Sequence, residues 1–186
     1  MFIALTGTPG TGKTSIAERL RSEGFTVVDI QRLAIDKNIT EGMDSERNSI
    51  ILDPDLMEKM VSERYHKTDD IIFESHLSHL LPSMDKVIVL RCRPDVLKDR
   101  LAKKDWLKKK ILENLEAEII DVVLCEAVEE HGKNIVFELD TTMLSVEECA
   151  TIIKDLISSG FSMNERFRVG QIDWSEFALN DFLKEI

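Results

Sequence analysis

Gly7-Thr8-Pro9-Gly10-Thr11-Gly12-Lys13-Thr14 matches the phosphate-binding pattern GxxxxGK[ST]. It directly follows a short apolar run at residues 2–5 and precedes a helical pattern that carries Ile16, Ala17 and Leu20. Glycines let successive backbone N–H groups turn toward an anion without interference from a Cβ atom. The positive end of the following helix adds its partial charge at the same point. The sequence therefore predicts a P-loop that binds a nucleoside triphosphate.

Within this loop, each polar side chain has an expected partner on the nucleotide. Lys13 is expected to reach the β- and γ-phosphates as a mobile positive charge, and the Thr14 hydroxyl is expected to bind Mg²⁺. The competing interpretation is a glycine-rich turn without a ligand. The residues predicted to bind ATP are Gly7, Gly10, Thr11, Gly12, Lys13, Thr14 and Ser15.

Apolar runs alternate with helical patterns along most of the chain. Strands are predicted at residues 2–5, 25–28, 71–73, 87–90 and 135–137, and helices at 54–66, 94–104, 107–131 and 145–158. Strands that alternate with helices indicate a parallel sheet covered on both faces. The pattern therefore predicts an α/β fold, with residues 31–52 and 161–186 as segments that fit the alternation poorly.

Composition limits the possible classes of protein. The 186 residues are 43% hydrophobic and carry a net charge of −11, which is typical of one globular domain and argues against a general nucleic-acid binder. The sequence has no run of 18 apolar residues and no signal peptide pattern at its start, so we expect no membrane span and a cytoplasmic location. Three widely spaced cysteines, Cys92, Cys125 and Cys149, indicate buried free thiols rather than disulfides or a zinc cluster.

Positive charge is concentrated at residues 91–110, where nine cations and three carboxylates give a local net charge of +6. Such an island on an acidic protein predicts a polyanion site, and its expected phosphate contacts are Arg91, Arg93, Arg100 and Lys104. The alternatives are a solvated helix face, or a surface that meets ribosomal RNA or an acidic partner.

A second candidate cluster, Glu74-Ser75-His76, ends the apolar run at residues 71–73. A carboxylate at the end of a strand beside a P-loop could hold a magnesium-bound water. A neutral His76 could position or deprotonate a water, or bind a phosphate through a hydrogen bond. A zinc site made by His76 and His79 is less favoured, because two further ligands are lacking.

The sequence also narrows the kind of P-loop protein. No NKxD pattern is present to read guanine, and the chain is short for a mechanical ATPase. Small P-loop kinases carry an acceptor-binding insertion after their second strand and a basic lid after the helix that follows the fourth. The segments at 31–52 and 91–110 fall at these two places. A lid of this kind excludes water from the transferring phosphate.

Over residues 1–158, the chain resembles the archaeal branch of the adenylate kinase isoenzyme 6 family, which comprises small nucleotide kinases that also act as ribosome-assembly ATPases. The resemblance rests on motifs in a fixed order. They are the P-loop, Asp44 with Ile51-Leu52-Asp53, the stretch from Glu74 to Pro82, Val89-Leu90-Arg91, Leu97 with Arg100-Leu101, Lys110, Asn114 and Glu118-Ile119.

The resemblance implies a P-loop α/β/α sandwich of adenylate-kinase type, with a five-stranded parallel sheet of order 2-3-1-4-5. It implies a kinase domain at 1–160, with an acceptor-nucleotide segment at 29–52 and a lid at 103–113, followed by an extension at 161–186. Its reaction is ATP + AMP ⇌ 2 ADP, with slower ATP hydrolysis and a role in small-subunit maturation through a platform ribosomal protein. The expected catalytic residues are Lys13, Glu74, His76, Arg91 and Arg100, with Thr14 and Glu74 at the magnesium and Lys104 at the nucleotide.

Three positions depart from the family pattern. Glu74 replaces the family's aspartate, Arg32 stands where an acid is common, and Lys104-Asp105-Trp106 replaces the arginine-containing lid motif. Because lysine cannot bind a phosphate with two parallel hydrogen bonds, we expect hydrolysis to be favoured relative to transfer. The leading hypothesis is therefore an AMP-phosphorylating kinase, and the alternative is a nucleotide-switched assembly ATPase whose main act is protein binding.

The extension at 161–186 lies outside the resemblance. Asp173 and Ser175 could cap a short amphipathic helix whose apolar side chains include Trp174, Phe177, Phe182 and Ile186. We expect this stripe to strap the helix to its own domain, with docking to a partner as the alternative.

Overall fold

The computed structural model describes residues 1–37, 42–44, 49–51, 53–104, 106–162, 165–179 and 182–183. Leu52, Asp105 and Ile186, which the sequence singled out, lie outside the described residues. The strands are β1 (Phe2–Gly7), β2 (Thr26–Asp29), β3 (Gly42–Asp44), β4 (Ser49–Ile51), β5 (Ile71–Glu74), β6 (Lys86–Arg91) and β7 (Val136–Asp140). The helices are α1 (Lys13–Ser22), α2 (Ile30–Asp36), α3 (Pro54–Arg64), α4 (Pro94–Ala102), α5 (Lys108–Ile119), α6 (Val122–His131), α7 (Val146–Ser158) and α8 (Ser175–Leu179), with a 3₁₀ turn at Ser78–Leu80.

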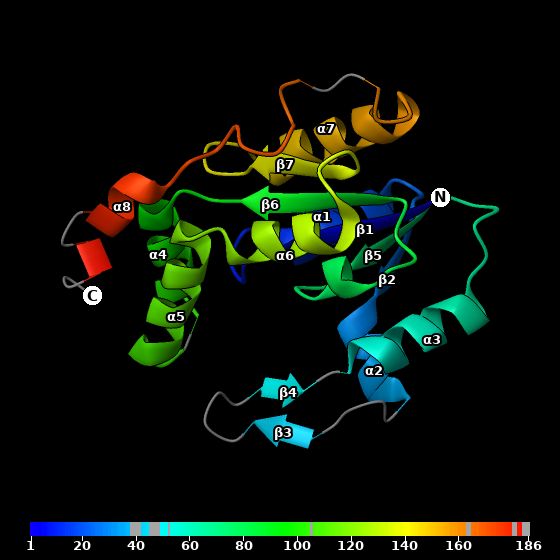
Figure 1. Cartoon of the computed structure of the whole chain (residues 1–186), viewed down its shortest axis with the longest axis horizontal. Helices are drawn as coiled ribbons and strands as arrows, with labels where there is room; N and C mark the ends of the chain where they lie inside the picture. Colours follow the sequence, from blue (N-terminus) through cyan, green and yellow to red (C-terminus); the bar gives the residue numbers. More distant parts are fainter. Residues whose placement is uncertain are drawn as a thin grey trace.

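Five strands form one parallel sheet in the order β2-β5-β1-β6-β7 (Figure 1). Numbered along the sheet-forming strands alone, this is the order 2-3-1-4-5, so the predicted fold class is confirmed. The central strand β1 is buried along its whole length. Its continuous apolar run is what a strand covered on both faces requires.

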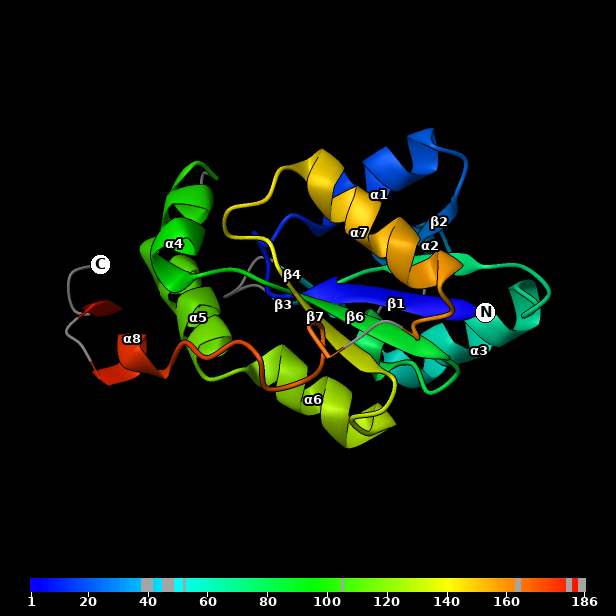
Figure 2. The same ribbon diagram turned by 90° about the horizontal axis from the view of Figure 1, so that it is seen from above.

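Alternate residues of β1 supply the two cores of the sandwich. Phe2 and Ala4 face a core shared with α2, α3 and α6, whereas Ile3 and Leu5 face a core shared with α1 and α7. Figure 2 shows α1 and α7 on one side of the sheet and α6 on the other. The sheet is therefore the middle layer of three.

A third apolar cluster joins α4 and α5 near the carboxyl ends of the strands, through Leu97, Leu101, Ile111 and Leu115 (Figure 1). The predicted single helix at 107–131 is wrong, because the chain breaks between α5 and α6. Asp121 there adopts a left-handed conformation with a φ of 58°, and its carboxylate pairs with Arg91. The ion pair between Arg91 and Asp121 thus stabilises a helix break that cannot be predicted from the spacing of apolar residues.

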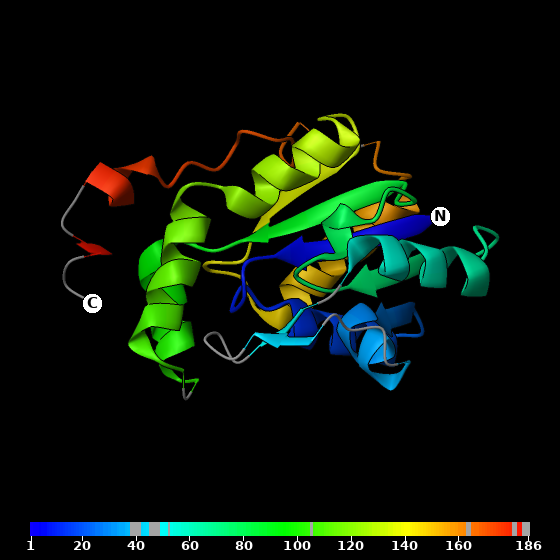
Figure 3. The same cartoon turned by 60° about the horizontal axis from the view of Figure 1, so that its bottom comes forward.

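The segment after β2, which is predicted to fit the strand–helix alternation poorly and to hold the acceptor, contains α2 and the antiparallel pair β3–β4. The Asp29 side chain caps α2 by accepting a hydrogen bond from the backbone of Arg32 at 2.9 Å. Figure 3 shows the β3–β4 hairpin (cyan) next to α2 (blue) and apart from α4 and α5 (green).

The C-terminal extension is helical only in part. Arg168 forms an antiparallel bridge with Phe137 of β7, so this segment first runs along the sheet edge. Farther on, Phe182 packs against the α4–α5 cluster and meets the Phe177 ring edge-on at 5.1 Å. These contacts agree with a segment strapped to its own domain.

The structure shows the environment of the three cysteines and the character of the helices. Cys92 and Cys149 are buried free thiols, as predicted, but Cys125 is exposed on α6. No helix among the described residues is long and apolar enough to span a membrane.

Candidate nucleotide-binding site

The P-loop connects β1 to α1 and is held close to its neighbours. Gly7 has a φ of 136°, and a Cβ atom there would lie 2.4 Å from the carbonyl oxygen of Leu90 on the adjacent strand. Gly10 has a φ of 98°, and its Cβ would lie 2.8 Å from side-chain atoms of Leu97 and Leu101 on α4. Both positions require glycine for backbone conformation and for space.

The side chain of Lys13 is buried within the P-loop. Its Nζ donates hydrogen bonds to the carbonyl oxygens of Gly7 at 2.7 Å and Thr8 at 3.1 Å. The pKa of Lys13 is lowered to about 8, chiefly by burial. The positive charge of Lys104 contributes to this lowering, whereas Glu74 and Glu118 oppose it. Phosphate oxygens are stronger partners than these carbonyls, so the ammonium is poised to exchange them for a nucleotide.

The protonation of the Lys13 side chain should change when a nucleotide binds. Near pH 8 the free protein holds the Lys13 proton only in part, and a bound polyphosphate raises the pKa of Lys13. Nucleotide binding at that pH should therefore take up a fraction of a proton, and uptake should shrink toward pH 6.5. Calorimetric titrations with ADP, in buffers of different ionisation enthalpy, measure it. Uptake that persists unchanged in Lys13→Met would assign the proton to another group.

An acidic pair lies beside Thr14 at the end of two neighbouring strands. The Thr14 hydroxyl donates to Oε1 of Glu74 at 3.3 Å, and Asp29 on β2 is paired in register with Glu74 on β5. The pKa of Glu74 is raised, chiefly by burial and then by the charge of Asp29. Both acids line the same cavity.

These oxygen atoms fit a magnesium ion. Mg²⁺ prefers oxygen ligands and usually combines one or two protein groups with phosphate and water oxygens. Among the described residues, no group of three or more His, Cys, Asp or Glu side chains could hold a metal by itself, so zinc at His76 and His79 finds no support. Sequence reasoning missed Asp29, because it sought the family's acid at Arg32. The signal was present, since Asp29 directly follows the predicted second strand.

The two histidines after β5 have different surroundings. His76 lines the cavity, and burial lowers its pKa to about 4, with the charge of Lys13 as the next cause. It is therefore neutral near pH 7. His79 is buried away from the cavity, where its ring bonds to Thr6 Oγ1 at 2.9 Å and to Glu126 at 3.0 Å. His79 thus links β1 to α6.

One cavity of about 1390 Å³ brings most of the predicted site residues together. On the P-loop side it is lined by Gly10, Thr11, Gly12, Lys13, Thr14 and Ser15. Beside them lie Asp29 and Glu74 at the ends of β2 and β5, Gln31 of α2, and His76 just after β5. Across from them it is lined by Arg100, Lys104, Trp106, Lys110 and Asn114, with Thr141 after β7. Gln31 and Thr141 are further lining residues that sequence reasoning did not identify.

The cations of the 91–110 island are divided among different tasks. Arg100, Lys104 and Lys110 line the cavity, and Arg100 is held by the hydroxyl and carbonyl oxygens of Thr141 at 3.1 and 2.8 Å. Arg93 forms an ion pair with Asp95 at 2.7 Å on the surface. Only part of the island therefore faces the cavity.

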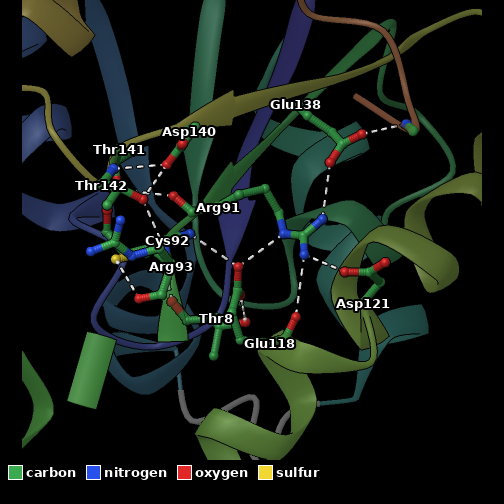
Figure 4. Close-up of polar contacts among 12 residues, drawn as sticks. Thr8, Arg91, Cys92, Arg93, Glu118, Asp121, Glu138, Asp140, Thr141 and Thr142 are labelled. Carbon is green, nitrogen blue, oxygen red and sulfur yellow. Dashed lines mark hydrogen bonds and ion pairs between the residues drawn. The ribbon is translucent and has the colours of Figure 1, made fainter. Parts of the chain in front are cut away.

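Arg91, predicted as a catalytic phosphate contact, does not line the cavity. Its side chain is buried, and its guanidinium binds Glu118, Asp121 and Glu138 (Figure 4). The correction has a physical reason: three carboxylates from α5, the helix break and β7 surround the guanidinium. Charge counting along the sequence gave no sign of these distant partners.

The Trp106 ring is in contact with two of the cavity-lining cations. The Nζ atom of Lys104 is 4.9 Å from the Trp106 ring centroid, and that of Lys110 is 4.5 Å from it. Both contacts are in the range of cation–π interactions. The indole ring thus holds Lys104 and Lys110 close together where they line the cavity.

The strand order, the glycine-rich loop and the acidic pair beside Thr14 together define a P-loop nucleotide-binding fold. Residues 3–121 match the family model of the AAA domain. The chain is 40% identical to a "Putative adenylate kinase" of Archaeoglobus fulgidus, over the full length of both proteins. It is also 40% identical to a protein of the same name from Methanocaldococcus jannaschii, over 95% of this chain and 94% of the relative. The chain belongs to this archaeal family, and the resemblance seen in the sequence is confirmed.

Solved structures agree on the fold. A shikimate kinase from Bacteroides thetaiotaomicron superposes with a TM-score of 0.57 over 85% of this chain and 98% of its own, at 15% identity. A shikimate kinase from Acinetobacter baumannii in complex with shikimate superposes with a TM-score of 0.56 over 88% and 95%, at 16% identity. At such low identity these likenesses concern the fold alone.

Proposed function

We propose that this protein is a nucleoside monophosphate kinase that transfers the γ-phosphate of ATP to AMP. The observation that carries the proposal is that the P-loop, an acidic strand end and the cationic side chains of α4 and α5 line one cavity together. Gln31 and Asp29, at the start of the proposed acceptor segment, open into the same space as Lys13 and Arg100. The name shared by the two archaeal relatives supports the same activity.

The residues of this chain would divide the work of phosphoryl transfer. P-loop N–H groups and Lys13 bind the β- and γ-phosphates of ATP, and Arg100 faces the same space from α4. An oxygen of the AMP phosphate attacks the γ-phosphorus as the bond to the β–γ bridging oxygen breaks, which leaves two ADP. Neutral His76 holds an acceptor oxygen or a water by a hydrogen bond. Thr14, Glu74 and Asp29 would hold Mg²⁺ through oxygen atoms or bound water, and the bound ion would neutralise phosphate charge.

The parts of the chain have proposed roles to match. Residues 1–160 are the kinase domain, 29–52 the acceptor segment and 103–113 the lid, with 161–186 as the extension strapped to it. ATP hydrolysis is the expected side reaction, because Lys104 occupies the place of an arginine that could grip a phosphate bidentately. The platform ribosomal protein partner and the role in small-subunit maturation rest on the sequence resemblance and stay predictions.

The proposal is tested by ADP formation at fixed Mg·ATP, with and without AMP. Strong stimulation by AMP, with two ADP formed for each ATP consumed, is the expected result. Phosphate release that is indifferent to AMP would instead favour the nucleotide-switched ATPase.

A second prediction concerns Lys104. Lys104→Ala should raise the KM for ATP or slow transfer by about ten-fold with no partner present, since it removes one charged phosphate contact. Lys104→Arg should raise the ratio of transfer to hydrolysis, because arginine can bind a phosphate with two parallel hydrogen bonds. The matched control is Lys133→Ala, whose exposed side chain lies outside the lid and does not line the cavity. An unchanged assay for Lys104→Ala would remove this residue from the lid.

A further inference from the structure

Glu118, near the end of α5, connects this helix to the P-loop. Its side chain is 2% exposed, and its Oε2 accepts a 2.5 Å hydrogen bond from the Thr8 hydroxyl (Figure 4). Its Oε1 accepts from Arg91 Nε at 2.9 Å and from the backbone N–H of Cys92 at 3.0 Å. A buried carboxylate thus meets the loop on one oxygen and β6 on the other.

The Thr8 carbonyl oxygen is a shared hydrogen-bond acceptor within the P-loop. Its carbonyl oxygen accepts hydrogen bonds from the backbone N–H and the hydroxyl of Thr11, at 3.3 and 2.9 Å. The same oxygen accepts from Nζ of Lys13 at 3.1 Å. A contact that holds the Thr8 side chain in place therefore also helps to hold its carbonyl oxygen, which accepts hydrogen bonds from Thr11 and Lys13.

Arg91 in turn fixes Glu118. Besides the carboxylate, its guanidinium binds the backbone carbonyl oxygen of Glu118 at 3.2 Å, the carboxylate of Asp121, and Glu138 at 2.9 Å. Burial opposes the charge of Arg91, but these carboxylates outweigh burial and raise its pKa. The guanidinium therefore stays charged and keeps Glu118 in one orientation.

The C-terminal extension holds the far end of this network. The backbone N–H of Gly170 donates to Oε1 of Glu138 at 2.5 Å, and the backbone N–H of Glu138 donates to the carbonyl of Phe167 at 2.8 Å. A continuous series of polar contacts thus runs from the extension through Glu138, Arg91 and Glu118 to Thr8 (Figure 4).

We propose that Glu118 is a positioning residue for phosphate binding, which sets the shape of the P-loop through the Thr8 hydroxyl while Arg91 fixes its carboxylate. Glu118 does not line the cavity, so its effect passes through Thr8. Backbone N–H groups bind an anion well only when they already point at it, because any reorganisation costs affinity. The inference rests on the proposed function only in that a nucleotide phosphate occupies the P-loop.

The test compares ADP affinity, measured by calorimetry, in Thr8→Val and Thr8→Ser. Valine has the shape of threonine but cannot donate to Glu118, so the Kd for ADP should rise about ten-fold. Serine keeps the hydroxyl and should retain most of the affinity. The matched control is Thr151→Val, which removes a hydroxyl that bonds to Glu147 on the exposed face of α7.

A double-mutant cycle that combines Thr8→Val with Glu118→Gln then tests whether the loss of ADP affinity comes from the contact between Thr8 and Glu118. If the two side chains act together, the combined loss of affinity should be clearly smaller than the product of the single losses. Should Glu118→Gln fail to fold, the comparison of Thr8→Val with Thr8→Ser decides alone. Wild-type ADP affinity in folded Thr8→Val, or equal losses in Thr8→Val and Thr8→Ser, would overturn the inference.

The outcome is separate from that for the proposed function, since ADP binding is read without turnover. A wild-type protein that does not phosphorylate AMP, but shows the Thr8 pattern in ADP binding, would refute the kinase and retain the positioning role. A merely structural role would lower the melting temperature of Thr8→Val and leave its Kd unchanged.

Discussion

Lys13→Ala should lower phosphoryl transfer by about 1,000-fold, as the loss of one preorganised donor to developing phosphate charge can cost this much. The Nζ atom of Lys13 donates hydrogen bonds to the carbonyl oxygens of Gly7 and Thr8. We expect it to contact the phosphates that the same loop binds. Steady-state rates of ADP formation measure the effect, and thermal unfolding shows whether the fold is retained.

Two further variants make the result for Lys13 specific. Lys13→Arg keeps a positive charge in a bulkier group and should recover only part of the rate. Lys133→Ala removes an exposed lysine outside the cavity and should leave the rate unchanged. Near-normal activity in folded Lys13→Ala would refute the assignment of the P-loop as the catalytic phosphate site.

His76→Ala should slow transfer and hydrolysis by about 100-fold while the Kd for ADP changes little. The pKa of His76 is lowered to about 4, so the neutral ring is present at every pH above about 5. The rate should therefore show no inflection from His76 between pH 6 and 8. Transient kinetics on the nucleotide-bound enzyme separate chemistry from binding.

The control for His76 is His66→Ala, an exposed residue between α3 and β5 that does not line the cavity. It should leave both rate and affinity unchanged. If His76→Ala lost stability and nucleotide affinity together, with normal chemistry in the bound fraction, the role of His76 would be structural.

The sheet and the P-loop could be predicted from sequence because both are local signals. The apolar runs of β1, β5 and β6 are continuous, as strands buried on both faces must be. The glycine pattern of the loop is set by backbone conformation and by close neighbours. Strand order, in contrast, came only from the family resemblance, since periodicity carries no information on which strands are adjacent.

The errors have a common physical cause, which is interaction between residues distant in sequence. Arg91 looked like a phosphate contact because it begins a basic window, but Glu118 and Glu138 surround it in the fold. The break at Asp121 is stabilised by the same arginine, in the middle of an apolar pattern that predicts one continuous helix. Asp29 joins the site only because β2 pairs with β5 in a register that places it beside Glu74.

The most direct test of the kinase assignment follows a labelled phosphorus atom. The protein is incubated with Mg²⁺, AMP and ATP that carries ³²P in its γ-phosphate, and the products are separated. We predict that the label appears in the β-phosphate of ADP, faster than in inorganic phosphate. Label found only in inorganic phosphate, at a rate that AMP does not change, would contradict the account.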